Sequence, residues 1–243
     1  MSAHYNYTDT YKCQPELKKL VRAQGLYQGV NKADAMAKKT GDSGRTNRRK
    51  QILEAAQRVI RTEGLAGITT RQISQEARCS EGALYVHFNG RLELLLAMLE
   101  ETLPTMLGPL EVLAQSVEHG AVHTNLSRAL EGIYRFHQRA TPLVAGLFAD
   151  PELHAAYRAS LSSQGKGPRL SLKVLENYIA AEQRLGRIDS TIAARMAAEL
   201  LMSASFFRAF SEPFFGTPFR PTWKVYHKQL LAAILPVSKA SRG

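Results

Sequence analysis

The stretch ITTRQISQEARCSEGALYVHF, residues 68–88, carries the pattern that decides the fold. Thr69, followed three positions later by Gln72, has the spacing of a capping box, in which side chain and backbone satisfy each other's unpaired groups at a helix start. Ser80 can cap a second short helix, from Glu81 to Phe88. Two short helices joined by a tight turn are typical of a helix-turn-helix, whose second helix enters the DNA major groove.

The apolar residues of this stretch are spaced to hold the two helices together. A preceding helix, which we expect to end at Gly64, carries an apolar stripe at helical spacing. Inward-facing positions of all three helices are then Ile52, Ala56, Val59, Ile60, Ile73, Ala77, Leu84 and Phe88. The positions left to face outward are Ser80, Glu81, Gly82, Tyr85 and His87. The small residue Gly82 would let the start of the second helix approach a phosphate.

Helical periodicity continues to the end of the chain and strand signals are absent, so we expect an all-α fold. Further helices are predicted near 91–104, 106–118, 124–140, 152–163, 168–185, 190–211 and 222–235. Breaks are expected at Thr141-Pro142 and at Pro213–Pro218, among others. Residues 1–45 are polar and interrupted by glycines, which predicts a flexible N-terminal extension.

The composition indicates a partner with negative charge. The 32 Lys and Arg residues exceed the 21 Asp and Glu residues, for a formal net charge of +11. A surplus of this size favours nucleic acid or an anionic membrane as partner. The 2 cysteines, Cys13 and Cys79, form no CxxC motif, and neither a signal peptide nor an apolar membrane span is evident. We therefore expect a cytoplasmic protein that does not cross a membrane.

The sequence resembles the TetR family of transcriptional regulators over residues 46–106. The matching positions follow the family's order of residue types, from the first helix to the helix after the motif: Ile52-Leu53, Ala55-Ala56, Gly64, Thr69-Thr70, Ile73, Ala77, Ser80, Leu84-Tyr85-Val86, His87-Phe88, Arg91 and Leu94-Leu95. Three positions depart from the family pattern. Arg78 stands where the turn usually has glycine, so a strained or shifted turn is expected. Cys79 replaces a common valine, and Arg91 a lysine.

The resemblance implies how the motif would bind DNA. Thr70, Tyr85, His87 and Arg91 would contact backbone phosphates, which position the protein. Base edges would lie near Arg71, Ser80, Glu81 and Gly82. The run containing Arg48 and Arg49 precedes the first helix, and it is either a solvated face or a contact to phosphate or the minor groove.

For the remaining chain, the resemblance implies a helical bundle, residues 107–243, that encloses a ligand and dimerises through its last two long helices. Aromatic and soft side chains of the middle helices are candidates for the ligand pocket: Phe136, His137, Phe148, Tyr157, Tyr178, Met202 and Phe206. Two apolar stripes are candidates for the homodimer interface: Ile192, Met196, Leu200, Phe207, Trp223, Tyr226, Leu230 and Ile234. Each of these residues can instead belong to the intramolecular core.

The function predicted from these observations is that of a DNA-binding regulator that is not an enzyme and uses no metal or cofactor. The resemblance favours a repressor that a small molecule releases from its operator, over an activator. A helical enzyme with an incidental motif and a basic adaptor for membranes or proteins are the alternatives. Ligand identity and operator sequence do not follow from the sequence.

Overall fold

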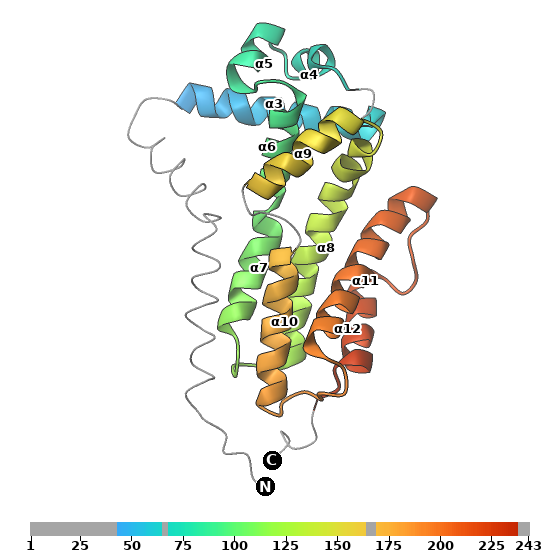
Figure 1. The fold of residues 1–243 in the computed structure, drawn as a ribbon. Helices are drawn as coiled ribbons and strands as arrows, with labels where there is room; N and C mark the ends of the chain where they lie inside the picture. Colours follow the sequence, from blue (N-terminus) through green and yellow to red (C-terminus); the bar gives the residue numbers. More distant parts are fainter. Residues whose placement is uncertain (1–42, 65–67, 164–168, 238–243) are drawn as a thin grey trace. The chain divides into compact units, whose positions relative to one another are not determined.

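The computed structural model describes residues 43–64, 68–163 and 169–237, and its elements are the helices α3 to α12 (Figure 1). Within these ranges the extended backbone is limited to an isolated bridge between Ile188 and Val237. The predicted all-α fold, with a helix-turn-helix ahead of a larger helical part, is confirmed. The predicted N-terminal extension lies almost entirely outside the described residues. None of the described helices has the length and apolar character needed to cross a membrane.

Residue contacts divide the described chain into two compact units. We call residues 43–64, 68–104 and 138–163 the motif unit. It contains α3 (Ser43–Glu63), α4 (Thr70–Glu76), α5 (Glu81–His87), α6 (Arg91–Thr102) and α9 (Pro151–Ser163). We call residues 105–137 and 169–237 the bundle unit. It contains α7 (Pro104–Gln115), α10 (Arg169–Arg184), α11 (Ala194–Phe215) and α12 (Trp223–Ile234). Helix α8 (Val122–Leu147) belongs to the bundle unit up to His137 and to the motif unit from Gln138.

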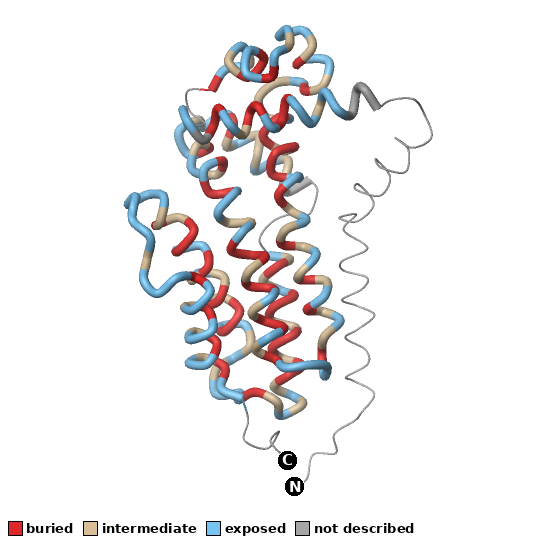
Figure 2. The backbone as a smooth tube through the Cα atoms, turned by 180° about the vertical axis from the view of Figure 1, so that it is seen from behind, coloured by how far each residue is buried: buried red, intermediate tan, exposed pale blue. Residues whose placement is uncertain are grey.

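The core of the motif unit forms as the apolar spacing predicts. Helix α3 ends at Glu63, and Gly64 follows with a left-handed φ of 75°. All eight residues predicted to face inward are buried, and Ile73, Leu84 and Phe88 are among the most completely buried side chains. Figure 2 shows buried and exposed residues alternating turn by turn along the described helices. Burial of these side chains holds α4 and α5 against α3.

One predicted helix break is wrong, because α8 continues through Pro142 to Leu147. The predicted break at Pro213–Pro218 is present but begins only at Gly216, because α11 continues through Pro213 to Phe215. A proline removes one backbone hydrogen bond and crowds the preceding turn, which favours but does not require a break. Pro142 is itself exposed, while Thr141, Leu143 and Leu147 beside it are buried. We infer that burial of these neighbours offsets the cost of the proline.

Helix α11 also begins later than predicted, at Ala194. The carboxylate of Asp189 accepts a hydrogen bond from the Thr191 amide at 2.6 Å, a local turn that competes with helix formation. Ile192 therefore lies before α11, and it does not share a helical stripe with Met196 and Leu200 as predicted.

In the bundle unit, α7 and α8 approach each other closely at Gly132. A Cβ atom at this position would lie 2.5 Å from the Thr105 carbonyl oxygen and 2.7 Å from Pro109 Cγ. Residue 132 is buried, so an added methyl group could not be directed into solvent. The contact requires a residue without a side chain.

Candidate nucleic-acid interface

The first helix of the motif, α4, begins with the predicted capping box. Thr69 accepts a hydrogen bond from the Gln72 amide at 3.2 Å, and the Gln72 side chain accepts one from the Thr69 amide at 2.9 Å. Both bonds satisfy backbone donors that a helix start otherwise leaves unpaired. Thr70, the first residue of α4, is half-buried, and Arg71 beside it is exposed.

The turn between α4 and α5 is strained at the residue that departs from the family pattern. Arg78 has a φ of 52°, in the left-handed region that favours glycine. Two hydrogen bonds hold it there: its amide donates to the Gln75 carbonyl at 3.1 Å, and the Cys79 amide donates to the Ser74 carbonyl at 2.9 Å. Together they form the Schellman ending of a helix, which normally carries glycine at this place. The strained turn expected from the sequence is confirmed.

Replacing Arg78 by glycine is therefore expected to stabilise the protein by about 1 kcal/mol, because the left-handed conformation costs an L-residue about that much. The melting temperature would rise by roughly 2–4 °C in a chain of this size. Arg78→Ala is the matched control, since it removes the same charge but keeps the Cβ. Equal melting temperatures for the two variants would contradict the strain.

The second helix of the motif, α5, presents a polar and accessible face. Ser80 caps it by accepting the Ala83 amide at 3.1 Å. Glu81 and Gly82 are exposed, and the Tyr85 side chain is 54% exposed although Leu84 next to it is buried. Tyr85 therefore faces outward, as its spacing predicts, and is not a core aromatic residue. His87, in the last turn of α5, is half-buried.

The arginines around the motif lie in different environments. Arg48 is exposed, whereas the Arg49 guanidinium lies 4.9 Å from the centre of the Phe88 ring. This cation–π contact connects α3 to the end of α5. Arg49 thus has a structural partner, whether or not it also reaches DNA.

Arg91, at the start of α6, has a partner that the sequence did not indicate. Its Nη1 atom lies 3.2 Å from Asp150 Oδ2, and the other carboxylate oxygen of Asp150 accepts the Leu153 amide at 3.0 Å. The Asp150 carboxylate therefore has two roles: one oxygen caps α9, and the other forms an ion pair with Arg91. The available signal was the Asp150-Pro151 pair, which is a helix-start sequence.

Comparison with known proteins places this geometry in a family. The model described as "Bacterial regulatory proteins, tetR family" matches residues 52–98, which include α4, α5 and most of α6. The chain is 41% identical over 64 residues to the uncharacterized HTH-type transcriptional regulator TtgW of Pseudomonas putida, covering 26% of this chain and 47% of that protein. Over this segment the chain matches the TetR family.

A second relative is the HTH-type transcriptional repressor AcnR of Corynebacterium diphtheriae, 32% identical over 90 residues, or 35% of this chain and 47% of the relative. The matched segment thus spans less than half the length of both curated relatives. The SmeT–triclosan complex superposes with a TM-score of 0.58 at 19% identity, covering 79% of this chain and 92% of that one. NalD of Pseudomonas aeruginosa gives 0.56 at 17% identity, covering 79% and 95%. At these identities the structures show a shared fold.

The residues predicted to line a ligand pocket are distributed over both units. Phe148 and Tyr157 lie in the motif unit, and the other five lie in the bundle unit. Tyr178 is fully buried, and its hydroxyl accepts a hydrogen bond from Asn125 Nδ2 at 3.1 Å. Phe148 and Phe206 are exposed, while Phe136, His137, Tyr157 and Met202 are half-buried. Tyr178 is thus a core residue, and the set as a whole remains a prediction.

His137 is the polar member of this set. Its Nδ1 atom lies 3.0 Å from Ser205 Oγ, and the Phe206 ring packs edge-on against it with 5.6 Å between ring centres. Burial lowers the pKa of His137 to about 4 from its ordinary value of 6.5. Between these two values the unfolded chain binds a proton that the native chain does not.

The free energy of unfolding should consequently fall as the pH is lowered from about 6.5 to about 4, by up to about 3 kcal/mol from His137. Burial also lowers the pKa of His227, which adds a loss of the same sign. Urea denaturation across this pH range, on the wild type and on His137→Gln, separates the contribution of His137 from that of His227. If both proteins show the same pH dependence, His137 is not the cause.

The predicted dimer residues divide into an exposed face and a buried one. Met196, Leu200 and Phe207 are 53%, 41% and 56% exposed on α11. Tyr226, Leu230 and Ile234 on α12 are half-buried. Trp223 is buried and stacks on Tyr134 of its own subunit, with 4.5 Å between ring centres. Trp223 therefore packs within the bundle unit, and the exposed candidates lie on α11.

Proposed function

We propose that this chain is a homodimeric transcriptional regulator that binds double-stranded DNA, and that it is a repressor released from its operator by a small-molecule ligand. The observation that carries the proposal is the exposed face of α5, from Glu81 to Tyr85, held outward by the buried Leu84 and Phe88. Helix-turn-helix proteins insert the corresponding helix into the major groove. AcnR is named a transcriptional repressor and NalD a secondary repressor, which supports repression rather than activation.

The proposed DNA contacts are those that the sequence predicted. Phosphate contacts from Thr70, Tyr85, His87 and Arg91 would position the motif, and Arg71, Ser80, Glu81 and Gly82 would lie near base edges. Arg48 and Arg49 lie within the first part of α3, not before the first helix as predicted, and would add to the positive potential there. Action on an operator would place the protein in the cytoplasm. We propose residues 46–106 as the DNA-binding domain and residues 107–243 as the ligand-binding and dimerisation domain.

The ion pair between Arg91 and Asp150 allows a test of this proposal, because substitutions of the two residues should change the affinity for DNA in opposite directions. Arg91→Ala should lower the affinity for duplex DNA of any sequence, and the salt slope of binding should fall by about 0.9 per subunit. Asp150→Asn should raise the affinity several-fold, because the guanidinium loses the attraction of the Asp150 carboxylate. Asparagine caps helices as well as aspartate, so α9 should keep its start.

The measurement is fluorescence anisotropy with a duplex from the gene's own upstream region, at several salt concentrations. Glu152→Gln, which removes an exposed charge of α9 nearby, is the control for Asp150→Asn. A folded Arg91→Ala variant with unchanged affinity and slope would refute the phosphate contact. Failure of the folded wild type to bind any duplex would refute the proposed function.

A further inference from the structure

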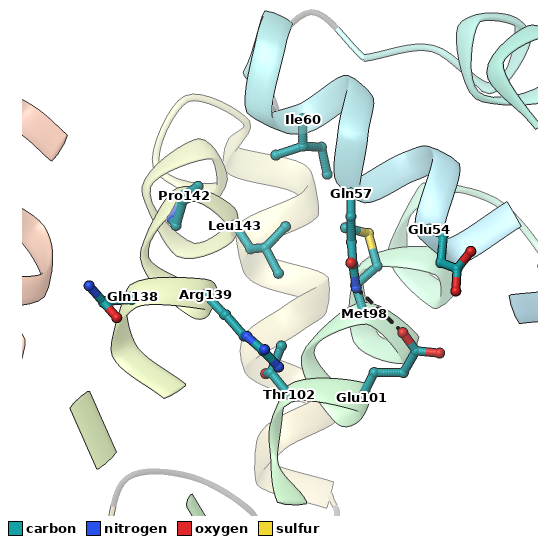
Figure 3. A pocket seen from close by; sticks show the side chains of 10 residues that line it. All are labelled: Glu54, Gln57, Ile60, Met98, Glu101, Thr102, Gln138, Arg139, Pro142 and Leu143. Carbon is teal, nitrogen blue, oxygen red and sulfur yellow. Dashed lines mark hydrogen bonds between the residues drawn. The ribbon is translucent and has the colours of Figure 1, made fainter. Parts of the chain in front are cut away.

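The motif unit contains a pocket, and none of the residues predicted from the sequence to bind a ligand lies in its lining. Its volume is about 430 Å³, and it lies between α3, α6 and the last part of α8 (Figure 3). Pockets that hold small ligands typically span about 300–1,000 Å³, so this one has room for a small molecule.

One part of the pocket wall is apolar. Ile60 comes from α3, Met98 from α6, and Pro142 and Leu143 from α8. Ile60, Met98 and Leu143 are buried in the motif unit. These side chains form a surface suited to an aromatic or branched aliphatic group.

The pocket also holds two opposite charges that do not pair with each other. Glu101 projects from α6 and Arg139 from α8, and Figure 3 shows the Arg139 side chain extending from α8 toward Thr102 and Glu101. Within the described part of the chain, neither side chain takes part in an ion pair. Glu101 accepts a long hydrogen bond, 3.4 Å, from Gln57 Nε2. Both charges are therefore available to a ligand.

The electrostatics at Glu101 favour a cationic group. Burial raises the pKa of its carboxyl group, and the Glu54 carboxylate raises it further, against the opposing effect of Arg49 and Lys50. A cation beside Glu101 would offset the desolvation of this carboxylate. An anion beside Arg139 would form a charge-assisted hydrogen bond with the guanidinium.

We propose that this pocket is an effector site additional to the ligand-binding domain proposed above, and that it takes a small amphipathic zwitterion of the class of an aromatic α-amino acid. The ammonium group binds Glu101, the carboxylate binds Arg139, and the aromatic ring packs on Ile60, Met98 and Leu143. This inference rests on the proposed function, because it assigns a place and a chemistry to a second ligand of the proposed DNA-binding regulator.

The position of the pocket gives the ligand a short path to the DNA-binding helices. Its α3 wall belongs to the helix on which α4 and α5 pack, and its α6 wall belongs to the helix that follows α5. A ligand that binds the pocket more tightly in the DNA-free arrangement of these helices lowers the affinity for DNA. By linkage, DNA must weaken the ligand by the same factor.

The test is isothermal titration calorimetry of the full chain with three matched probes. L-phenylalanine carries both charges, L-phenylalaninamide only the cation, and N-acetyl-L-phenylalanine only the anion. We expect L-phenylalanine to bind at least about tenfold more tightly than either of the others. Arg139→Gln should abolish its advantage over the amide, and Glu101→Gln its advantage over the N-acetyl compound. Arg135→Gln and Glu100→Gln, exposed neighbours outside the pocket lining, should leave both preferences intact.

Three results would overturn the assignment: no binding of L-phenylalanine at millimolar concentration, equal affinities for the three probes, or preferences that survive both pocket substitutions. Operator binding is measured separately by anisotropy, with and without L-phenylalanine. A chain that binds DNA but fails the calorimetric test overturns this inference alone. A chain that binds no DNA overturns the proposed function, whatever calorimetry finds.

Discussion

Replacing Leu200 by glutamate is expected to make the protein monomeric at micromolar concentration and to weaken its binding to a two-half-site duplex by about a hundredfold or more. Leu200 lies between Met196 and Phe207 on the exposed apolar face of α11. A carboxylate there would have to be buried without a partner when two subunits meet, which costs several kcal/mol. Each monomer would then bind a half-site separately, without the increase in affinity that a dimer obtains by binding both half-sites at once.

Val112→Glu is the matched control for this experiment. Val112 is 45% exposed on α7, outside the proposed interface, so the same change of charge and polarity should leave the dimer intact. Sedimentation velocity and anisotropy report the two effects independently. A Leu200→Glu variant that remains dimeric would show that the exposed face of α11 is not the dimer interface.

Replacing Gly132 by alanine is expected to lower the free energy of unfolding by about 2–3 kcal/mol. The added methyl group would meet the Thr105 carbonyl oxygen at 2.5 Å, a distance that only movement of the α7 backbone can relieve. In a chain of this size the loss corresponds to a melting temperature lower by roughly 5–10 °C.

Gly108→Ala, on the facing helix α7, should change the free energy of unfolding in the opposite direction. Gly108 lies in α7 and is exposed, and a Cβ atom at this position would meet no other atom within 4 Å, so alanine fits without strain. It should stabilise the protein by about 0.5–1 kcal/mol, because alanine restricts the unfolded chain and favours the helix. Differential scanning calorimetry of both variants tests the pair. Similar shifts for both would show that α7 and α8 are not in close contact at Gly132.

The helix-turn-helix could be predicted from the sequence because its determinants are local. The capping box at Thr69, the cap at Ser80 and the spacing of Ile73, Leu84 and Phe88 each act within a few residues. Even the strained turn was foreseeable, since a non-glycine residue at a Schellman ending has few alternatives. These local determinants do not depend on the rest of the tertiary structure, so the sequence alone reveals them.

The remaining features depend on contacts between distant segments. The Arg91–Asp150 pair joins residues 59 positions apart, and the Tyr134–Trp223 stack joins α8 to α12. Helix α8 passes through Pro142 because neighbouring residues are buried by other elements, which a local propensity does not register. The pocket needs three helices at once, so no single stretch of sequence reveals it.

The double role of Asp150 has a consequence for how such a regulator can evolve. An aspartate codon becomes an asparagine codon through one base change, and asparagine would keep the cap of α9 while removing the negative charge beside Arg91. Under the proposed function, natural variants could thus acquire a different affinity for DNA through a mutation outside α5. Selection could then adjust the strength of regulation in a lineage while the proposed base-reading residues of α5 stay the same.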